Sequence, residues 1–204
     1  MADEGTATVH VIDDDDDARD SLAFLLKTSK LPVESYPNAA AFLEVAPSAA
    51  GVVVTDVRMP EMDGLELTVR LKEMGVALPV IVVTGHGDIP LAVEAMRAGV
   101  IDFIEKPFDG DRMLGAIRLA LSKQEQDGAL DNEGAEYLRR IETLSSRERQ
   151  VLDGLVAGKA SKVIARDLDI SPRTVEVYRA NVMAKTTARS LSELVRMALK
   201  AGIA

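Results

Sequence analysis

The fold is decided by the stretch Thr-Val-His-Val-Ile-Asp-Asp, residues 8–14, in which a short apolar run ends in two carboxylates. Short runs rich in valine and isoleucine are typical of buried parallel strands. Between the runs, apolar residues recur at the spacing of a helix. We therefore predict five β-α units that form a doubly wound α/β sheet. The five predicted strands are Thr8–Ile12, Pro32–Tyr36, Gly51–Thr55, Leu78–Thr84 and Val100–Ile104.

Polar side chains stand at the carboxyl ends of these runs. Asp13 and Asp14 follow the first run and Asp56 the third, while Thr84 ends the fourth and Lys106 follows the fifth. Ligands of open α/β sheets bind beyond the carboxyl ends of the strands, so we expect these five groups in one crevice. Clustered carboxylates suit Mg²⁺, and a lysine and a hydroxyl beside them suit phosphate oxygens. The pattern predicts magnesium-assisted phosphoryl transfer to a carboxylate.

Four motifs in order resemble the receiver domain of two-component response regulators over about residues 7–123. They are Asp13-Asp14, Thr55-Asp56-Val57-Arg58-Met59-Pro60, Val83-Thr84-Gly85 and Glu105-Lys106-Pro107. The resemblance implies a flavodoxin-like sheet with strand order 2-1-3-4-5 and a cis bond between Lys106 and Pro107.

The resemblance also implies residue roles. Asp56 accepts the phosphoryl group of a sensor histidine kinase, and Thr84 and Lys106 hold the phosphoryl oxygens. Phe103 is the aromatic residue that changes rotamer with Thr84 when the domain switches. The implied ligands of Mg²⁺ are Asp13, Asp14, Asp56 and the backbone carbonyl of Arg58.

The acidic run permits other interpretations. Asp13-x-Asp15 also resembles the aspartyl-phosphate phosphohydrolases, whose first aspartate is the nucleophile, but Asp17 stands where that family has threonine or valine. An EF-hand is excluded because Ala18 replaces the glycine required at position six of the loop. We expect Asp15, Asp16 and Asp17 to be a solvated turn that begins a helix.

The composition sets further limits. The chain has no cysteine, which excludes disulfides and thiolate chemistry, and its histidines, His10 and His86, are too few for a histidine-rich metal site. We give His86 no catalytic role. No apolar run is long enough to span a bilayer, and the N-terminus is acidic where a secretion signal is basic, so we expect a soluble, cytoplasmic protein without membrane contacts.

The net charge of −9 argues against a nucleic-acid partner only while the chain is taken whole. Residues 1–124 hold 21 acidic and 11 basic residues, residues 125–136 five acidic and none basic, and residues 137–204 seven acidic and 13 basic. The net charges are −10, −5 and +6. We predict a receiver domain at 1–123, an acidic linker at 124–137 and a basic domain at 138–204.

The basic part has no strand-like run and predicts four helices, at about 145–158, 161–168, 172–186 and 190–201. The second and third, joined by Asp169-Ile-Ser-Pro172, form a helix-turn-helix, whose second helix enters the major groove of DNA. Its exposed face suits base edges and its flanks suit phosphates. The predicted DNA contacts are Lys162, Arg173, Thr174, Glu176, Val177, Arg179, Ala180, Asn181 and Lys185.

Leu144-Ser-Ser-Arg-Glu-Arg-Gln-Val-Leu152 and Ile170-Ser-Pro-Arg-Thr-Val175 resemble the LuxR-type helix-turn-helix, and with the receiver this gives the NarL/FixJ architecture. Two departures are Val163, where the family often has glutamate, and Thr186, at a usually apolar position. If Thr186 packs inward, an unpaired hydroxyl there costs about 1–3 kcal/mol. A helical protein-interaction module with a solvated basic face is the alternative for this segment.

The resemblance implies a transcriptional activator of nitrogen-fixation genes that responds to low oxygen through its kinase, with promoter DNA and RNA polymerase as partners. Phosphorylation is expected to produce a homodimer through the face built from residues 88–98, 100–104 and 109–122. The apolar stripe of the last helix, which includes Leu191, Leu194 and Leu199, suits either a dimer contact or plain core. The sequence leaves open the operator, the kinase, the phosphoryl lifetime, the arrangement of the domains and whether the receiver blocks DNA binding.

Overall fold

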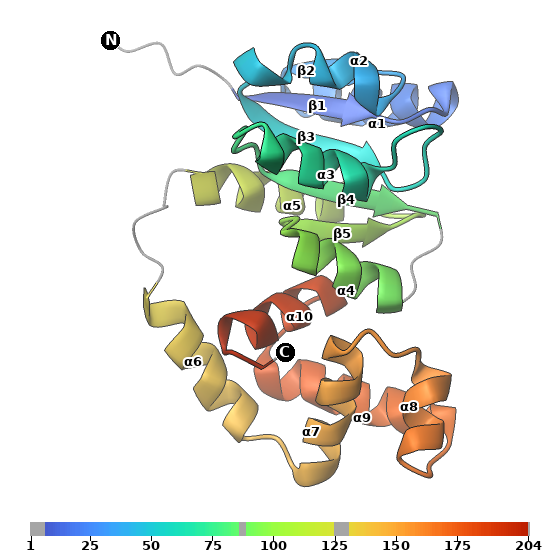
Figure 1. Cartoon of the computed structure of the whole chain (residues 1–204), viewed down its shortest axis with the longest axis vertical. Coiled ribbons are helices and arrows are strands. Elements are labelled where there is room, and N and C mark those ends of the chain that lie inside the picture. Colours follow the sequence, from blue (N-terminus) through green and yellow to red (C-terminus); the bar gives the residue numbers. More distant parts are fainter. Residues whose placement is uncertain (1–6, 86–88, 125–130, 204) are drawn as a thin grey trace. The chain divides into compact units, whose positions relative to one another are not determined.

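The computed structural model describes residues 7–85, 89–124 and 131–203 (Figure 1). The chain divides into two compact units, one with residues 1–86 and 98–126 and the other with residues 87–97 and 127–204. Across the described ranges, no helix is both long and apolar enough to cross a membrane.

A five-stranded parallel sheet forms the centre of the first unit, in the order β2-β1-β3-β4-β5 (Figure 1). The order confirms the doubly wound fold, and each strand begins and ends within two residues of the predicted bounds. Valine and isoleucine fill the central strands because both faces of the sheet are covered. The strands are β1 (Thr8–Ile12), β2 (Val33–Tyr36), β3 (Gly51–Asp56), β4 (Val80–Thr84) and β5 (Asp102–Glu105).

Helices follow the strands. One core face joins Val9 and Val54 of the sheet to Leu26 of α1 and to Met113 and Ile117 of α5. On the opposite face, the ring of Phe42 of α2 packs against that of buried His10 at 5.3 Å between centroids, with the ring planes tilted by 46°. The connecting helices are α1 (Asp16–Thr28), α2 (Ala39–Leu43), the short 3₁₀ helix η1 (Ala46–Ser48), α3 (Gly64–Glu73), α4 (Ile89–Ala98) and α5 (Gly110–Gln124).

Local sequence sets where the helices begin. The Asp15 side chain caps α1 by accepting the Ala18 N–H, so the acidic run begins a helix as predicted. Asp63 caps α3 in a capping box whose second half is the Glu66 side chain. These caps satisfy N–H groups that would otherwise lack partners, and they fix where the loops after β1 and β3 end.

Residues 131–203, the larger described part of the second unit, contain helices and no strand. The four predicted helices are present, as α7 (Ser146–Val156), α8 (Ser161–Asp167), α9 (Pro172–Thr186) and α10 (Leu191–Lys200). Ser145 and Glu148 form the predicted capping box of α7, and Ser171 caps α9 ahead of a proline at its first position. The core of this unit includes Leu152, Ile164, Val175 and other apolar residues of all four helices.

A fifth helix, α6 (Asp131–Glu142), begins inside the range predicted as linker and packs against α9 and α10. The sequence there contains strong helix formers. Ile141 at its far end is buried. The prediction of a linker therefore missed a helix that tertiary packing stabilises. The rest of the predicted linker, residues 125–130, lies outside the described residues.

The apolar stripe of α10 is mostly core. Leu194, Val195 and Ala198 are buried, whereas Leu191 and Leu199 are half-buried. Because α10 packs against α6, α7 and α9, the stripe needs no second copy of the chain to cover it. This outcome removes α10 as an argument for a dimer.

Candidate functional site

The carboxyl ends of three strands meet at one charged group. The Lys106 ammonium donates to Asp13 Oδ2 at 2.9 Å and to Asp56 Oδ1 at 2.8 Å. Asp13 follows β1 and Asp56 ends β3, which are neighbours in the sheet, whereas Lys106 follows β5 at its edge. The long lysine side chain thus reaches past the end of β4 to join the two carboxylates.

The surroundings of Lys106 favour its protonated, charged form. Burial opposes the charged form of the ammonium, but the hydrogen bonds and charges of Asp56 and Asp13 outweigh burial and raise the pKa of Lys106. A cavity of about 20 Å³ lies against these three residues and Thr55, enough space for about one water molecule. Both carboxylates are mostly buried, with side chains 10% and 11% exposed for Asp13 and Asp56.

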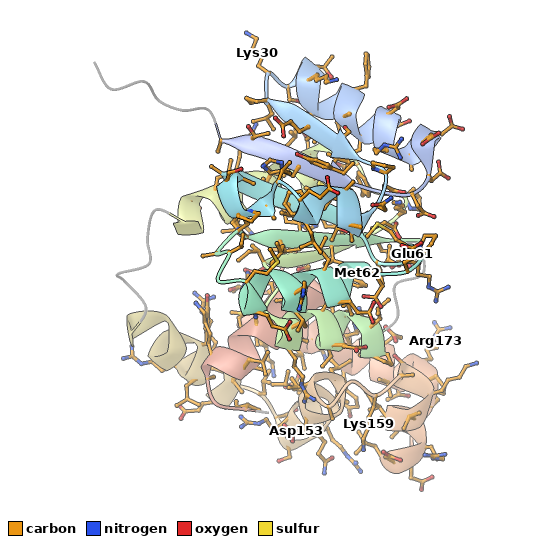
Figure 2. The ribbon with its side chains drawn as sticks, turned by 45° about the horizontal axis from the view of Figure 1, so that its top comes forward. Lys30, Glu61, Met62, Asp153, Lys159 and Arg173 are labelled. Carbon is orange, nitrogen blue, oxygen red and sulfur yellow. The ribbon has the colours of Figure 1, made fainter. Side chains whose placement is uncertain are left out.

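The backbone fixes the second oxygen of Asp56. Its Oδ2 accepts the Arg58 N–H at 2.6 Å, so both oxygens of this carboxylate are directed by donors. The loop after Asp56 also carries Glu61 and Met62, labelled in Figure 2, and ends at Gly64. The ideal Cβ position at Gly64 lies 2.3 Å from the carbonyl oxygen of Asp56, so only glycine fits there without a shift of the backbone.

Thr84 and Phe103 lie on neighbouring strands of the same sheet edge. Thr84 is buried, and its carbonyl accepts the Lys106 N–H at 2.7 Å. Phe103 is half-buried and pairs with Val82 across β4 and β5. The peptide bond between Lys106 and Pro107 is cis, as predicted. Thr84 is therefore tied by its backbone to the lysine, while the rotamer change predicted for Phe103 stays a prediction.

The acidic loop after β1 separates into different environments. Asp13 is buried against Lys106, whereas Asp14 is exposed. Arg19, which sequence reasoning missed, donates from Nη1 to the Asp13 carbonyl at 2.8 Å and pairs with Asp16. The only sequence signal for Arg19 is its place in the first turn of α1, two residues beyond the acidic run. His86 lies outside the described residues.

The donor set is compatible with Mg²⁺. Among the described residues, no group of three or more histidine, cysteine or carboxylate side chains could hold a metal ion. Mg²⁺ needs no such cage, because it keeps several waters and commonly takes only one or two carboxylates. Asp13 and Asp56 supply two hard oxygen ligands brought together by one cation, and Asp14 stands beside them in sequence. The residues present therefore fit the predicted ion.

In the second unit, α8 and α9 form the predicted helix-turn-helix. Ile164 and Ala165 of α8 and Val175 and Val182 of α9 are buried, which orients the opposite side of α9 outward. Arg173, at the second position of α9, projects away from the ribbon (Figure 2). The exposed positions of α9 recur at helical spacing and form one stripe, made of Pro172, Arg173, Glu176, Val177, Ala180, Asn181, Ala184 and Lys185.

Comparison with known proteins identifies both domains. The family model of the response regulator receiver domain matches residues 9–118, and that of the bacterial regulatory proteins of the LuxR family matches residues 142–198. The chain belongs to the response regulators of the NarL/FixJ type. It combines a receiver domain with a LuxR-type DNA-binding domain.

Relatives and solved structures of this response regulator extend over nearly the whole chain. It is 57% identical to the transcriptional regulatory protein FixJ of Azorhizobium caulinodans over 96% of this chain and 93% of that one. It is 53% identical to FixJ of Rhizobium meliloti, over 96% of both chains. The crystal structure of full-length FixJ from B. japonicum is similar with a TM-score of 0.57 and 49% identity, covering 97% and 98% of the two chains.

The remaining predicted contacts of the response regulator fall into two groups. Lys162 is exposed, and Thr174 is half-buried with its backbone N–H on the Ser171 cap. Lys185, predicted to contact phosphate, instead donates to the buried Glu148 of α7 at 2.6 Å. This ion pair gives Lys185 a structural role, and its DNA contact stays a prediction.

The structure places both departures from the family pattern. Thr186 packs inward with no exposed surface, but its hydroxyl donates to the Val182 carbonyl at 2.7 Å, so the expected penalty for an unpaired hydroxyl is absent. Arg140 of α6 also donates to the Thr186 carbonyl and to the hydroxyl of Thr187, which ends α9 in the left-handed conformation. The end of the recognition helix is therefore well held. Val163 is half-buried in α8.

Proposed function

We propose that this response regulator is a phosphorylation-dependent transcriptional activator. Asp56 accepts a phosphoryl group from a sensor histidine kinase, and the C-terminal unit binds promoter DNA. The observation that carries the proposal is the Lys106 ammonium between the carboxylates of Asp13 and Asp56. A lysine in that position neutralises the charge that phosphoryl transfer to Asp56 brings into the pocket.

The chemistry follows from the residues of the pocket. A carboxylate oxygen of Asp56 attacks the phosphorus of a phosphohistidine, so that a P–O bond forms while the P–N bond breaks. The electron pair returns to the imidazole nitrogen, which takes up a proton. Asp13 and Asp56, with Asp14 and the Arg58 carbonyl, are the groups that would hold Mg²⁺, which supplies positive charge beside the phosphoryl oxygens. Lys106 and the Thr84 hydroxyl then hold those oxygens.

The switch is a local change of charge at Asp56 that causes a conformational change elsewhere in the domain. The acyl phosphate adds roughly −1.5 to −2 charge next to Lys106, which now has a stronger partner than the bare carboxylate. Thr84 moves toward the phosphoryl group and Phe103 turns inward, and the altered surface favours a homodimer. A dimer suits paired half-sites on promoter DNA, and contacts with RNA polymerase complete the activator.

The biological setting rests on the family resemblance alone. On that basis we propose that the genes activated are those of nitrogen fixation and that the signal is low oxygen, sensed by the partner kinase. Because promoter DNA and RNA polymerase are its partners, we propose that the protein acts in the cytoplasm. Its relatives are transcriptional regulators, which agrees with a protein that is not an enzyme beyond its own phosphotransfer and dephosphorylation.

The test uses the full chain with acetyl phosphate and Mg²⁺. We expect one added phosphoryl group, mapped to Asp56 by mass spectrometry, and tighter binding to DNA selected from a random library. Asp56→Asn is the matched control and should show neither. Label on Asp13 with sustained turnover of a phosphate ester would instead identify an aspartyl-phosphate phosphohydrolase.

Dimerisation has its own measurement. Sedimentation of the full chain with and without acetyl phosphate should show an increase in mass that Asp56→Asn abolishes. A constant mass with Asp56 fully modified would remove the dimer from the proposal, while leaving phosphoryl transfer and DNA binding in place.

A further inference from the structure

One acidic side chain interrupts the exposed stripe of the recognition helix α9. Glu176 stands among Arg173, Val177, Ala180 and Asn181, all exposed. A carboxylate on a surface that meets DNA repels the phosphates, so it weakens binding to every sequence. A direct contact with the amino group of cytosine is one way for such a residue to offset that loss.

The contacts of Glu176 indicate a role other than a direct base contact. Its Oε1 accepts the Ser161 hydroxyl of α8 at 2.7 Å, and its Oε2 pairs with Arg179 Nη1 at 3.5 Å. Each carboxylate oxygen thus has a partner within the domain before any DNA is bound. Ser161 is the first residue of α8, and the residue before it, Ala160, offers no side-chain cap. Glu176 therefore links the start of α8 to one particular arginine of α9.

Arg179 is the arginine of α9 whose orientation Glu176 can control. It lies one turn beyond Glu176 and at the edge of the stripe, since its side chain is only 32% exposed. Guanine is recognised by a planar guanidinium that meets two acceptors at once, so the plane and reach of the group decide the contact. A flexible arginine at the edge of the stripe loses much of that geometry to free rotamers, and a fixed carboxylate restores it.

We propose that Glu176 is a positioning residue, which holds Arg179 for guanine in the major groove of duplex DNA and makes no base contact itself. Ser161 fixes Glu176, and Glu176 fixes Arg179. The inference rests on the proposed DNA-binding function and deepens it. It places the specificity of one base pair in a relay of three side chains that begins on α8.

The relay has a consequence that a direct contact does not share. Glu176→Gln keeps the size of the side chain and can still accept from Ser161, but it loses the charge that holds Arg179. Affinity for DNA of random sequence should therefore rise, because a repulsive charge is gone. Discrimination should fall at one base pair only, the same one that Arg179 contacts.

The experiment selects preferred sites from a randomised duplex library with the phosphorylated full chain. We expect Arg179→Ala to lose about 5- to 150-fold in discrimination at one base pair. Glu176→Gln and Ser161→Ala should lose about 1.5- to 5-fold at that same base pair. Arg173→Ala is the matched control on the same helix, outside the relay, and should alter a different base pair. Circular dichroism confirms that each variant is folded.

Three outcomes would overturn the inference. Loss at a separate base pair in Glu176→Gln, with Ser161→Ala silent, would show that Glu176 contacts a base itself. Unchanged preference in Glu176→Gln, beside a clear loss in Arg179→Ala, would show that the arginine needs no support. If the phosphorylated wild type selects no sequence at all, the proposed DNA-binding function fails, and the inference fails with it. If the wild type selects a site and one of the first two outcomes is seen, only the inference about Glu176 fails.

Discussion

Gly64 lies so close to the carbonyl oxygen of Asp56 that a Cβ atom added at Gly64 would be 2.3 Å from that oxygen. The first residue of α3 thus contacts the backbone of the residue proposed to carry the phosphoryl group, and Gly64 N–H also donates to the Val57 carbonyl. Any side chain at Gly64 must displace either α3 or the end of β3. The start of α3 and the Asp56 carboxylate are therefore positioned together.

Gly64→Ala tests this contact. A methyl group pressed against backbone cannot be relieved by a rotamer change, so we expect the free energy of unfolding to fall by about 1–3 kcal/mol or more. The rate of phosphorylation by acetyl phosphate should fall with it. Gly115→Ala is the control, because a Cβ there meets open space in the exposed interior of α5. It should leave the phosphorylation rate unchanged and raise the free energy of unfolding by about 0.5–1 kcal/mol. A fully active and stable Gly64→Ala would contradict the contact.

Arg140→Ala tests the anchor at the end of α9. The guanidinium donates to the Thr186 carbonyl and the Thr187 hydroxyl at the negative end of the helix. We expect a loss of about 1 kcal/mol in the free energy of unfolding, measured by denaturant titration, and weaker DNA binding. Arg139→Ala removes an exposed charge from the same helix and should have little effect on stability. Equal losses from both substitutions would show that only net charge matters.

Glu148→Gln tests the pH dependence of the C-terminal unit. The hydrogen bonds from Lys185 and from the Ser145 backbone lower the pKa of Glu148 from 4.5 to about 2. Because the folded pKa lies below the unfolded one, the carboxylate stabilises the fold above pH 4.5 and loses that effect as the pH falls toward 2. The wild type should therefore melt higher than the variant at pH 7, with a gap that narrows below pH 4.5. A gap that stays constant down to pH 3 would refute this origin.

Thr186 allows packing and hydrogen bonding to be compared at one site. Its hydroxyl donates to a carbonyl within its own helix, so its loss should cost little, and Thr186→Val should change the free energy of unfolding by less than about 1 kcal/mol. Thr186→Ser keeps the hydroxyl but removes a buried methyl group, and should cost roughly 0.5–1.5 kcal/mol. Denaturant titration of the two variants decides the matter: a larger loss in Thr186→Val would show that the hydroxyl dominates.

The sequence predicts the sheet and the pocket because both depend on order along the chain. Apolar runs mark the strands, and parallel strands bring the residues just beyond their carboxyl ends to one edge, so Asp13, Asp56 and Lys106 could be expected together. The same reasoning places Val175 and Val182 in the core and Arg173 outside it. These predictions needed periodicity and the direction of strands only.

The features that sequence reasoning missed depend on which side chains meet in three dimensions. Lys185 looks like a phosphate contact until Glu148 of another helix is placed beside it. The sequence predicts Glu176 as a base contact but does not reveal the hydrogen bond that Ser161 of α8 donates to it. The start of α6 looks like a linker because its acidic composition says nothing of α9 and α10. In each case a partner distant in the sequence adds a contact that the local sequence does not show.

The lysine that closes the pocket comes from the last strand of the sheet, while its two partners come from the first and third. During synthesis, Asp13 and Asp56 leave the ribosome well before residue 106, and they stand as repelling anions until β5 joins the edge. A chain that ends before residue 106 therefore lacks the cation that joins Asp13 and Asp56, and we expect it to be a poor phosphoryl acceptor. Completion of β5 is therefore the step that joins the two carboxylates, and it needs only the first half of the chain.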